Sequence, residues 1–266
     1  MIFDNSSKGT TITPANATCP CLSGEVFSSC CGLDTSTPPR GVIIKKHVLS
    51  NKQCDEMVKY LSTQQRFDAT IGIYAGTRGN NHTTKSSDRI TDFVKSGKLT
   101  TKIKKVMETQ LFNVIEKELG KTLIWYQKPT VLYYKAGSWY GPHADADRYD
   151  PKTACWHREM DRDYSLLIYL SDKFEGGSLV FTRFGYSFRP QKGDMILFPS
   201  DHRYIHMAQR VSSGDRYVIV SFCSVKESKK VQYTFPPEVV ILDPNGYKTV
   251  SKNPLGSAMS TLINKD

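Results

Sequence analysis

The sequence predicts a mainly β fold with flanking helices, a sandwich or barrel of the α+β class, preceded by a small cysteine-rich unit. From Lys121 onward, short runs of β-branched and aromatic residues alternate with turn signals, which is typical of stacked or closed antiparallel sheets. Two segments with helical periodicity precede these runs. Four of the seven cysteines lie within residues 19–31, ahead of both kinds of element.

The composition fits one globular domain with appendages. The chain has 266 residues, of which 39% are apolar and 23% charged, so a domain of about 200 residues can bury a core. The net charge is +10, but Lys and Arg are scattered, and we do not expect a nucleic-acid partner. The polar N-terminus lacks a signal-peptide core, and no apolar run approaches the ~18 residues of a membrane span. Seven cysteines, of which Cys54, Cys155 and Cys223 lie far apart in the sequence, favour a reducing compartment over a disulfide framework. We therefore expect a cytoplasmic protein, and the lack of a long apolar run predicts no membrane anchor.

Composition divides the chain into five segments. Residues 1–18, rich in Ser, Thr and Asn, are expected to be a disordered lead-in. Residues 19–32 form the compact cysteine unit, and residues 33–40, "LDTSTPPR", form a linker. The main domain covers residues 41–225, and residues 226–266 form a C-terminal extension.

The main domain begins with a strand and two helices. Residues 41–49 are a strand candidate, and Ser50 then starts a helix with Gln53 as its capping-box partner. A strand-like start and a loop rich in Gly, Asn and Ser occupy residues 66–97. An apolar stripe predicts the second helix at residues 99–119.

The strands of the predicted barrel follow these helices. They are expected at residues 122–127, 130–135, 164–170, 177–182, 194–199 and 216–222. Residues 236–247, "PPEVVILDPNGY", add a candidate strand and turn within the C-terminal extension.

A histidine and an aspartate two residues apart stand directly before a charge-rich stretch. On a strand, the side chains of His143 and Asp145 point to the same face. They supply two of the three ligands of a facial triad for Fe(II), which leaves open coordination positions. The third ligand is expected from a later strand, where His202 and His206 are the candidates. Arg216 lies ten residues after His206 and suits bidentate pairing with the distal carboxylate of a 2-oxo acid.

The order and spacing of these residues resemble the 2-oxoglutarate- and Fe(II)-dependent oxygenases, specifically their prolyl 4-hydroxylase-like branch. The resemblance covers roughly residues 41–225. It is carried by "YKAGSWYGPHAD" before and through the His-x-Asp pair, by "LLIYLSDKFEGGSLVF", by "QKGDMILFPS", and by His206, Val211 and Arg216. Among the candidate third ligands, only His206 has the distance to Arg216 that the family shows.

The resemblance implies a double-stranded β-helix, or jelly-roll, core with the metal at its mouth. The implied Fe(II) ligands are His143, Asp145 and His206. The residues implied to bind 2-oxoglutarate are Arg216 and Tyr169, and those implied to face the substrate are Tyr134, Tyr140 and Arg162. Dioxygen is the second cosubstrate, and ascorbate is a candidate additional cofactor. The sequence departs from the common family pattern at Leu179, where Thr is frequent, and at Arg216, where collagen-type members usually have Lys.

The implied activity is a dioxygenase that hydroxylates a peptidyl residue, with proline favoured, and releases succinate and CO₂. The expected partner is a protein or peptide substrate. Oxidation of a free amino acid or another small molecule is one alternative, and a non-catalytic docking protein is another. Nucleobase demethylation is the least favoured, because that branch has an Arg-Asn-Thr-Phe-Arg-like run that is absent here. The loops at residues 73–90 and 146–162 are expected to select the substrate.

The N-terminal cysteines form a second motif. Cys19, Cys21, Cys30 and Cys31 place four thiolates within 13 residues, and these can close around one Zn²⁺ tetrahedrally. Two disulfides or four idle thiols are the alternatives. The stretch resembles the SEC-C motif, whose pattern Pro20, Ser23, Gly24 and Gly32 also match, whereas Leu22 stands where the motif has Gly and Glu25 stands in a loop usually richer in Lys. A Cys₄ site has no open position, so the zinc is expected to be structural, and the resemblance implies a small knob for protein docking.

Overall fold

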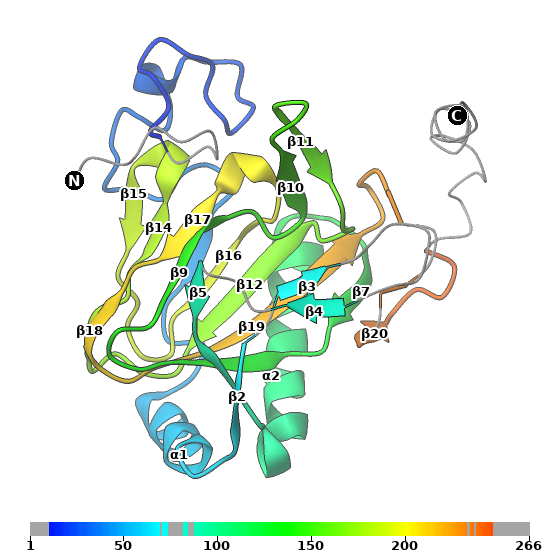
Figure 1. Cartoon of the computed structure of the whole chain (residues 1–266). Helices are drawn as coiled ribbons and strands as arrows, with labels where there is room; N and C mark the ends of the chain where they lie inside the picture. The colour runs from blue at the N-terminus through cyan, green and yellow to red at the C-terminus, as the bar shows by residue number, and fades with distance from the viewer. Residues whose placement is uncertain are drawn as a thin grey trace.

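A computed structural model of the chain describes residues 11–69, 71–73, 82–84, 88–232, 235–236 and 238–246. Strands predominate and form two facing antiparallel sheets, with two helices outside them (Figure 1). The predicted mainly β fold with flanking helices is therefore confirmed. Among the described residues, no helix has the length and apolar character needed to cross a membrane.

The larger sheet has nine strands within the described residues. Seven follow the spatial order β1 (Ile43–Lys45), β16 (Met195–Pro199), β12 (Tyr164–Tyr169), β19 (Arg216–Val225), β8 (Thr130–Tyr134), β6 (Asp92–Val94) and β2 (Arg66–Asp68). The remaining two are β7 (Leu123–Gln127), which pairs with β19, and β20 (Val239–Ile241), which pairs with β7. The strand expected in the C-terminal extension thus exists and joins this sheet.

The smaller sheet carries the candidate site. Its order is β15 (Tyr186–Phe188), β14 (Leu179–Phe181), β17 (His206–Ala208), β9 (Trp139–His143) and β5 (Arg89–Ile90). Three two-stranded ribbons complete the described β structure. They pair β10 (Asp147–Asp150) with β11 (Cys155–Arg158), β13 (Phe174–Gly176) with β18 (Val211–Gly214), and β3 (Ile71–Ile73) with β4 (His82–Thr84).

The central strands of the larger sheet bury both of their faces. In β12, Leu166 and Ile168 belong to a core shared with helix residues such as Met107. The alternate residues Leu167 and Tyr169 belong to a second core that the two sheets enclose. Successive side chains of a strand point to opposite faces. Burial of both faces explains why these strands are nearly continuous apolar runs in the sequence.

The two helices form where their sequence signals predict them. Helix α1 (Asn51–Leu61) has Ser50 as its N-cap, with the full capping box to Gln53. The second helical segment runs from η3 (Gly97–Leu99) through α2 (Thr100–Leu111) and ends in the π-helical η4 (Phe112–Glu118). This segment matches the predicted span, although its last two turns are wider than an α-helix.

The N-terminal unit packs against the barrel. The Thr13 N–H donates to the Arg183 carbonyl at 2.9 Å. Phe27, in the turn η1 (Phe27–Ser29), is buried and belongs to the core between the sheets. Residues 11–18, part of the expected disordered lead-in, thus make contacts with the N-terminal unit and the barrel. Residues 1–10 lie outside the described residues.

Two buried carboxylates bind the start of the C-terminal extension to the barrel. Asp163 accepts hydrogen bonds from the Ser228 hydroxyl at 2.6 Å and the Lys230 ammonium at 3.1 Å, and pairs with Arg158 at 2.5 Å. Asp161 is fully buried and accepts from the two backbone N–H groups that follow Lys230, at 2.8 and 3.0 Å. This segment, which we call the C-terminal strap (residues 226–232), thus belongs to the main domain. Residues 247–266 lie outside the described residues.

Replacing Asp163 should destabilise the fold strongly. The change Asp163→Ala leaves the buried Lys230 ammonium without its carboxylate, and breaking a buried pair costs about 3–5 kcal/mol. Urea unfolding followed by circular dichroism measures the loss. Asp55→Ala is the control, because Asp55 is 65% exposed in its pair with Lys192 and should contribute less than about 1 kcal/mol. Equal losses in the two variants would contradict the role of Asp163.

Candidate metal and cosubstrate site

Two neighbouring strands of the smaller sheet bring the three predicted metal ligands together. His143 ends β9, His206 begins β17, and the two residues are paired in the sheet. Asp145 follows β9 by two residues. Its carboxylate oxygens lie 3.5 Å from the Nε2 atoms of His143 and of His206. One ligand atom from each residue lies within 4.8 Å of the others, so the trio can hold one metal ion.

Backbone carbonyls orient both imidazoles. The Nδ1 atom of His143 lies 2.8 Å from the Gly141 carbonyl, and that of His206 lies 3.0 Å from the Tyr204 carbonyl. A carbonyl only accepts, so each Nδ1 carries the proton and donates. The Nε2 lone pairs therefore point toward Asp145, as metal ligation requires.

The protonation states of the trio also suit a metal. Burial alone would raise the pKa of Asp145, but His206, His143 and a hydrogen bond from Ser165 at 2.6 Å hold it well below its usual range. Burial lowers the pKa of His206 to about 4. A carboxylate beside a neutral imidazole is the ligand state that a divalent cation binds. With two histidines and one carboxylate, the donor set fits non-haem Fe(II).

A β-bulge shapes the wall beside the metal ligands. Between the paired positions, β9 has two residues where β17 has one, because His143 faces His206 while Tyr140 faces Ala208. On a regular strand, residues 140 and 143 would point to opposite faces. The extra residue turns both into the barrel, where the Tyr140 ring stacks on the His143 ring with centroids 3.7 Å apart.

Arg216 forms the far end of the site. It lies at the start of β19, is 1% exposed, and donates through Nη2 to the Tyr169 hydroxyl at 3.3 Å. Its Nε and Nη1 atoms have no hydrogen-bond partner among the described residues. A buried guanidinium that lacks a carboxylate is costly. The arrangement therefore fits a bound anion, such as the carboxylate of a 2-oxo acid.

A cavity of about 520 Å³ connects Arg216 with the metal ligands. Tyr134, Tyr140 and Arg162, the predicted substrate residues, all line it. Arg162 is held rigidly, because its guanidinium lies 3.8 Å from the Phe222 ring centre and donates to the Asp145 carbonyl at 3.2 Å. Arg162 thus lies against the backbone of a metal ligand.

The predicted substrate loop at residues 146–162 folds as the β10–β11 hairpin. Arg148 and Glu159 from this segment line the cavity and form an ion pair at 2.9 Å. His202, the alternative third ligand, bonds instead to Asp147 at 2.6 Å and lies outside the metal trio. Most of the other predicted loop, residues 73–90, lies outside the described residues.

Several site residues lacked a signal in the sequence. Ser165 and Ser200 are buried, bond to each other at 2.7 Å, and hold the side chain and the backbone N–H of Asp145. Gln127 accepts from Arg162 at 2.7 Å. These residues come from separate strands and meet Asp145 only in the folded barrel, so neither spacing nor residue type identifies them.

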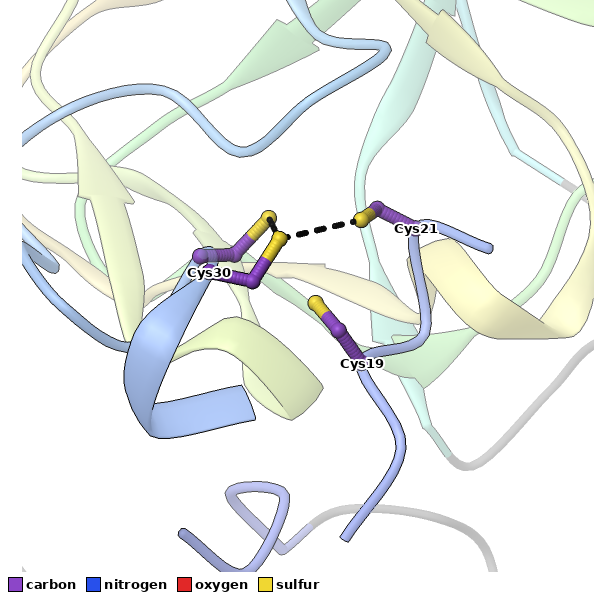
Figure 2. Close-up of side chains that lie close together, drawn as sticks. Cys19, Cys21 and Cys30 are labelled. Carbon is purple, nitrogen blue, oxygen red and sulfur yellow. Dashed lines mark hydrogen bonds between the residues drawn. The ribbon is translucent and has the colours of Figure 1, made fainter. Parts of the chain in front are cut away.

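The N-terminal cysteines form a second metal-like cluster. The side chains of Cys19, Cys21 and Cys30 converge (Figure 2), and with Cys31 all four sulfur atoms lie within 4.8 Å of one another. The Cys21–Cys30 and Cys30–Cys31 sulfur distances are 3.5 and 3.9 Å, and all four are free thiols. A tetrahedral Zn²⁺ with Zn–S bonds of about 2.3 Å needs sulfur separations of about 3.8 Å, so the cluster fits zinc better than two disulfides.

Comparison with protein families identifies both units. Residues 129–224 match the model of the 2OG-Fe(II) oxygenase superfamily, and residues 16–33 match that of the SEC-C motif. The first match contains the metal trio, Tyr169 and Arg216. The second contains all four clustered cysteines. These matches confirm the resemblance to the 2-oxoglutarate- and Fe(II)-dependent oxygenases and to the SEC-C motif that the sequence shows.

Individual relatives are prolyl hydroxylases and similar oxygenases. Prolyl 3-hydroxylase 2 of Rattus norvegicus is 36% identical over 86 residues, which cover 29% of this chain and 12% of the relative. The 2-oxoglutarate and iron-dependent oxygenase domain-containing protein 3 of Xenopus tropicalis is 33% identical over 100 residues, which cover 34% of this chain and 28% of the relative. The matches thus span only a small part of these longer proteins.

Solved structures share the fold at low sequence identity. A prolyl hydroxylase of Trichoplax adhaerens, in complex with a hypoxia inducible factor peptide fragment, gives a TM-score of 0.52 at 17% identity and covers 71% of this chain and 88% of that one. A Pseudomonas putida prolyl-4-hydroxylase gives 0.50 at 17% identity and covers 69% and 92%. These likenesses support the jelly-roll architecture.

Removing Arg216 should weaken 2-oxoglutarate binding. In Arg216→Ala the distal carboxylate loses a buried charge-assisted pair worth about 2–5 kcal/mol, so the Kd should rise by about 30-fold or more. Isothermal titration with Mn(II)-loaded protein measures it. Arg210→Ala is the control, because the Arg210 side chain is exposed and donates to the Gly137 carbonyl rather than into the cavity. An unchanged Kd in folded Arg216→Ala would refute this assignment.

Proposed function

We propose that this chain is a 2-oxoglutarate- and Fe(II)-dependent dioxygenase that hydroxylates a peptidyl residue, with proline as the favoured residue, and releases succinate and CO₂. One observation carries the proposal. The incompletely paired guanidinium of Arg216 and the His143, Asp145 and His206 trio line the same cavity. The cavity thus offers a metal site and an anion site together, as this reaction requires.

Separate groups of residues would bind the metal and the cosubstrate. The trio would hold Fe(II) through two Nε2 atoms and one carboxylate oxygen. Arg216 and the Tyr169 hydroxyl would bind the distal carboxylate of 2-oxoglutarate. Together with 2-oxoglutarate and dioxygen, the iron would supply an oxidant able to hydroxylate an unactivated C–H bond. Ascorbate, the candidate additional cofactor, stays a prediction.

The cavity walls support a peptide substrate. Tyr134 and Tyr140 present aromatic surface beside His143, and flat amphipathic walls suit a proline ring in an extended, pre-ordered backbone. Arg162 adds a fixed donor group near Asp145 that suits a peptide carbonyl. The names of the relatives agree with this reading, since one is a prolyl 3-hydroxylase and one solved neighbour holds a peptide.

A proline-containing peptide should stimulate succinate formation more than free L-proline does. Selectivity comes from how the cavity holds the target C–H bond, and a peptide engages more of its walls. Succinate release and a mass gain of one oxygen in the peptide measure the outcome. His143→Ala should abolish both signals. Equal or better stimulation by the free amino acid, with no peptide gaining mass, would favour a small-molecule substrate, and no turnover with either would favour the docking-protein alternative.

We further propose that the four clustered cysteines hold one structural Zn²⁺ and that the knob serves as a docking surface for another protein. The support is the near-tetrahedral spacing of the sulfur atoms. Free thiols at this spacing also agree with the expected cytoplasmic location, where thiols stay reduced.

Purified protein should carry one zinc per chain. Elemental analysis after mild removal of iron measures it, because a closed Cys₄ site releases its metal slowly compared with an open one. Cys30→Ala should lose the zinc, whereas Cys155→Ala, which removes an exposed cysteine far from the cluster in sequence, should keep it. Zinc-free wild-type protein, or a disulfide within the cluster under reducing conditions, would contradict the zinc site.

A further inference from the structure

The N-terminal unit contacts the turn that precedes His206, one of the proposed iron ligands. The 3-10 turn η6 (His202–Tyr204) precedes His206 and ends in Tyr204, whose side chain is 3% exposed. The Tyr204 hydroxyl donates to the Arg40 carbonyl at 2.5 Å. Arg40 lies in the linker that follows the cysteine knob (residues 19–32). Tyr204 thus contacts His206 through its backbone carbonyl and the N-terminal unit through its side chain.

Packing and two hydrogen bonds connect the N-terminal unit with His206. Tyr204 and Cys19 belong to the same buried cluster, against which Cys31 also packs, and the Arg40 carbonyl accepts from the Tyr204 hydroxyl. The Tyr204 carbonyl in turn accepts from His206 Nδ1 at 3.0 Å. The first of these bonds fixes the Tyr204 side chain, and the second sets the direction of the His206 Nε2 lone pair.

The packing around Tyr204 leaves its ring little freedom. Gly41 has φ of +89°, and a Cβ there would lie 2.6 Å from the Tyr204 hydroxyl oxygen, so the backbone must be glycine to approach the phenol. On the other side, the Phe184 ring packs against the Tyr204 ring with centroids 5.2 Å apart.

The N-terminal unit also braces the neighbouring turn. This turn, η5 (Thr182–Phe184), accepts a hydrogen bond at the Arg183 carbonyl from Thr13. Its Thr182 N–H donates to the Ile205 carbonyl at 3.0 Å, immediately before His206. Residues 11–41 therefore contact both turns that position this ligand.

We propose that Tyr204 is a positioning residue through which the cysteine knob holds His206 in its metal-binding orientation, so that metal loss from the knob weakens metal binding in the barrel. This inference rests on the proposed function, because it takes His206 as an iron ligand. Tyr204 itself need not touch substrate or cosubstrate. The SEC-C motif then has a role inside the enzyme in addition to any docking.

The test measures metal affinity directly, with Mn(II) as probe and its electron paramagnetic resonance signal as readout. Mn(II) prefers carboxylate and imidazole over thiolate ligands, so it reports on the barrel site. Tyr204→Phe removes only the hydroxyl link, and Cys31→Ala removes one zinc ligand. Each should raise the Mn(II) Kd by about tenfold, as expected when a group that orients a ligand is lost.

Three comparisons make the test specific. The double variant Cys31→Ala/Tyr204→Phe should bind no more weakly than the weaker single variant, because both changes interrupt one path. Tyr186→Phe removes a hydroxyl from the same buried core that forms no hydrogen bond to either cluster among the described residues, so it should keep the wild-type Kd. In unmodified protein, stripping the zinc with an organomercurial should weaken Mn(II) binding, and restoring zinc should recover it.

Distinct outcomes separate this inference from the proposed function. Single variants that match wild type, or a double variant whose effects multiply, would overturn the coupling while leaving the oxygenase assignment intact. Failure of wild-type protein to bind Mn(II) at all would instead overturn the iron site, and the inference with it.

Discussion

The pairing of β9 with β17 is the constraint on which the site depends. It sets His143 opposite His206, and the bulge between them admits Tyr140 to the same wall. The serine pair on neighbouring strands then fixes Asp145 between the two imidazoles. A slip of one strand by one residue would turn the histidine on that strand away from the cavity. The candidate metal site thus depends on strand alignment more than on any loop.

Burial of Arg216 imposes a second constraint. Two aromatic rings lie beside its guanidinium. The guanidinium carbon is 4.4 Å from the ring centre of Tyr134 and 5.0 Å from that of Tyr169. In the absence of an anion this is an unfavourable place for a charge. A bound carboxylate would pair with this buried charge and remove its unfavourable contribution. Ligand binding would therefore raise the free energy of unfolding. Buried charges that lack a protein partner are typical of ligand-binding sites.

The sequence was informative where chemistry depends on spacing along the chain. The His-x-Asp pair, the later His206 and Arg216, and the four cysteines follow linear patterns, as do the capped helix at Ser50 and the two-faced apolar strands. The features it could not provide arise from contacts between distant segments. They include the bulge in β9, the support of Asp145 by Ser165, and the ordering of residues 11–18 against the barrel. The composition of that last segment does not reveal its contact with the barrel, because the hydrogen bond from Thr13 is to Arg183, which is distant in the sequence.

The C-terminal strap has a consequence for where the domain can be cut. The family match ends at residue 224, and the sequence boundary was expected at residue 225. A fragment ending there would retain Asp161 and Asp163, and Arg158 beside Asp163, but would remove the hydroxyl, ammonium and amide donors that the strap supplies to the two carboxylates. A fragment that keeps these donors must extend at least through residue 232.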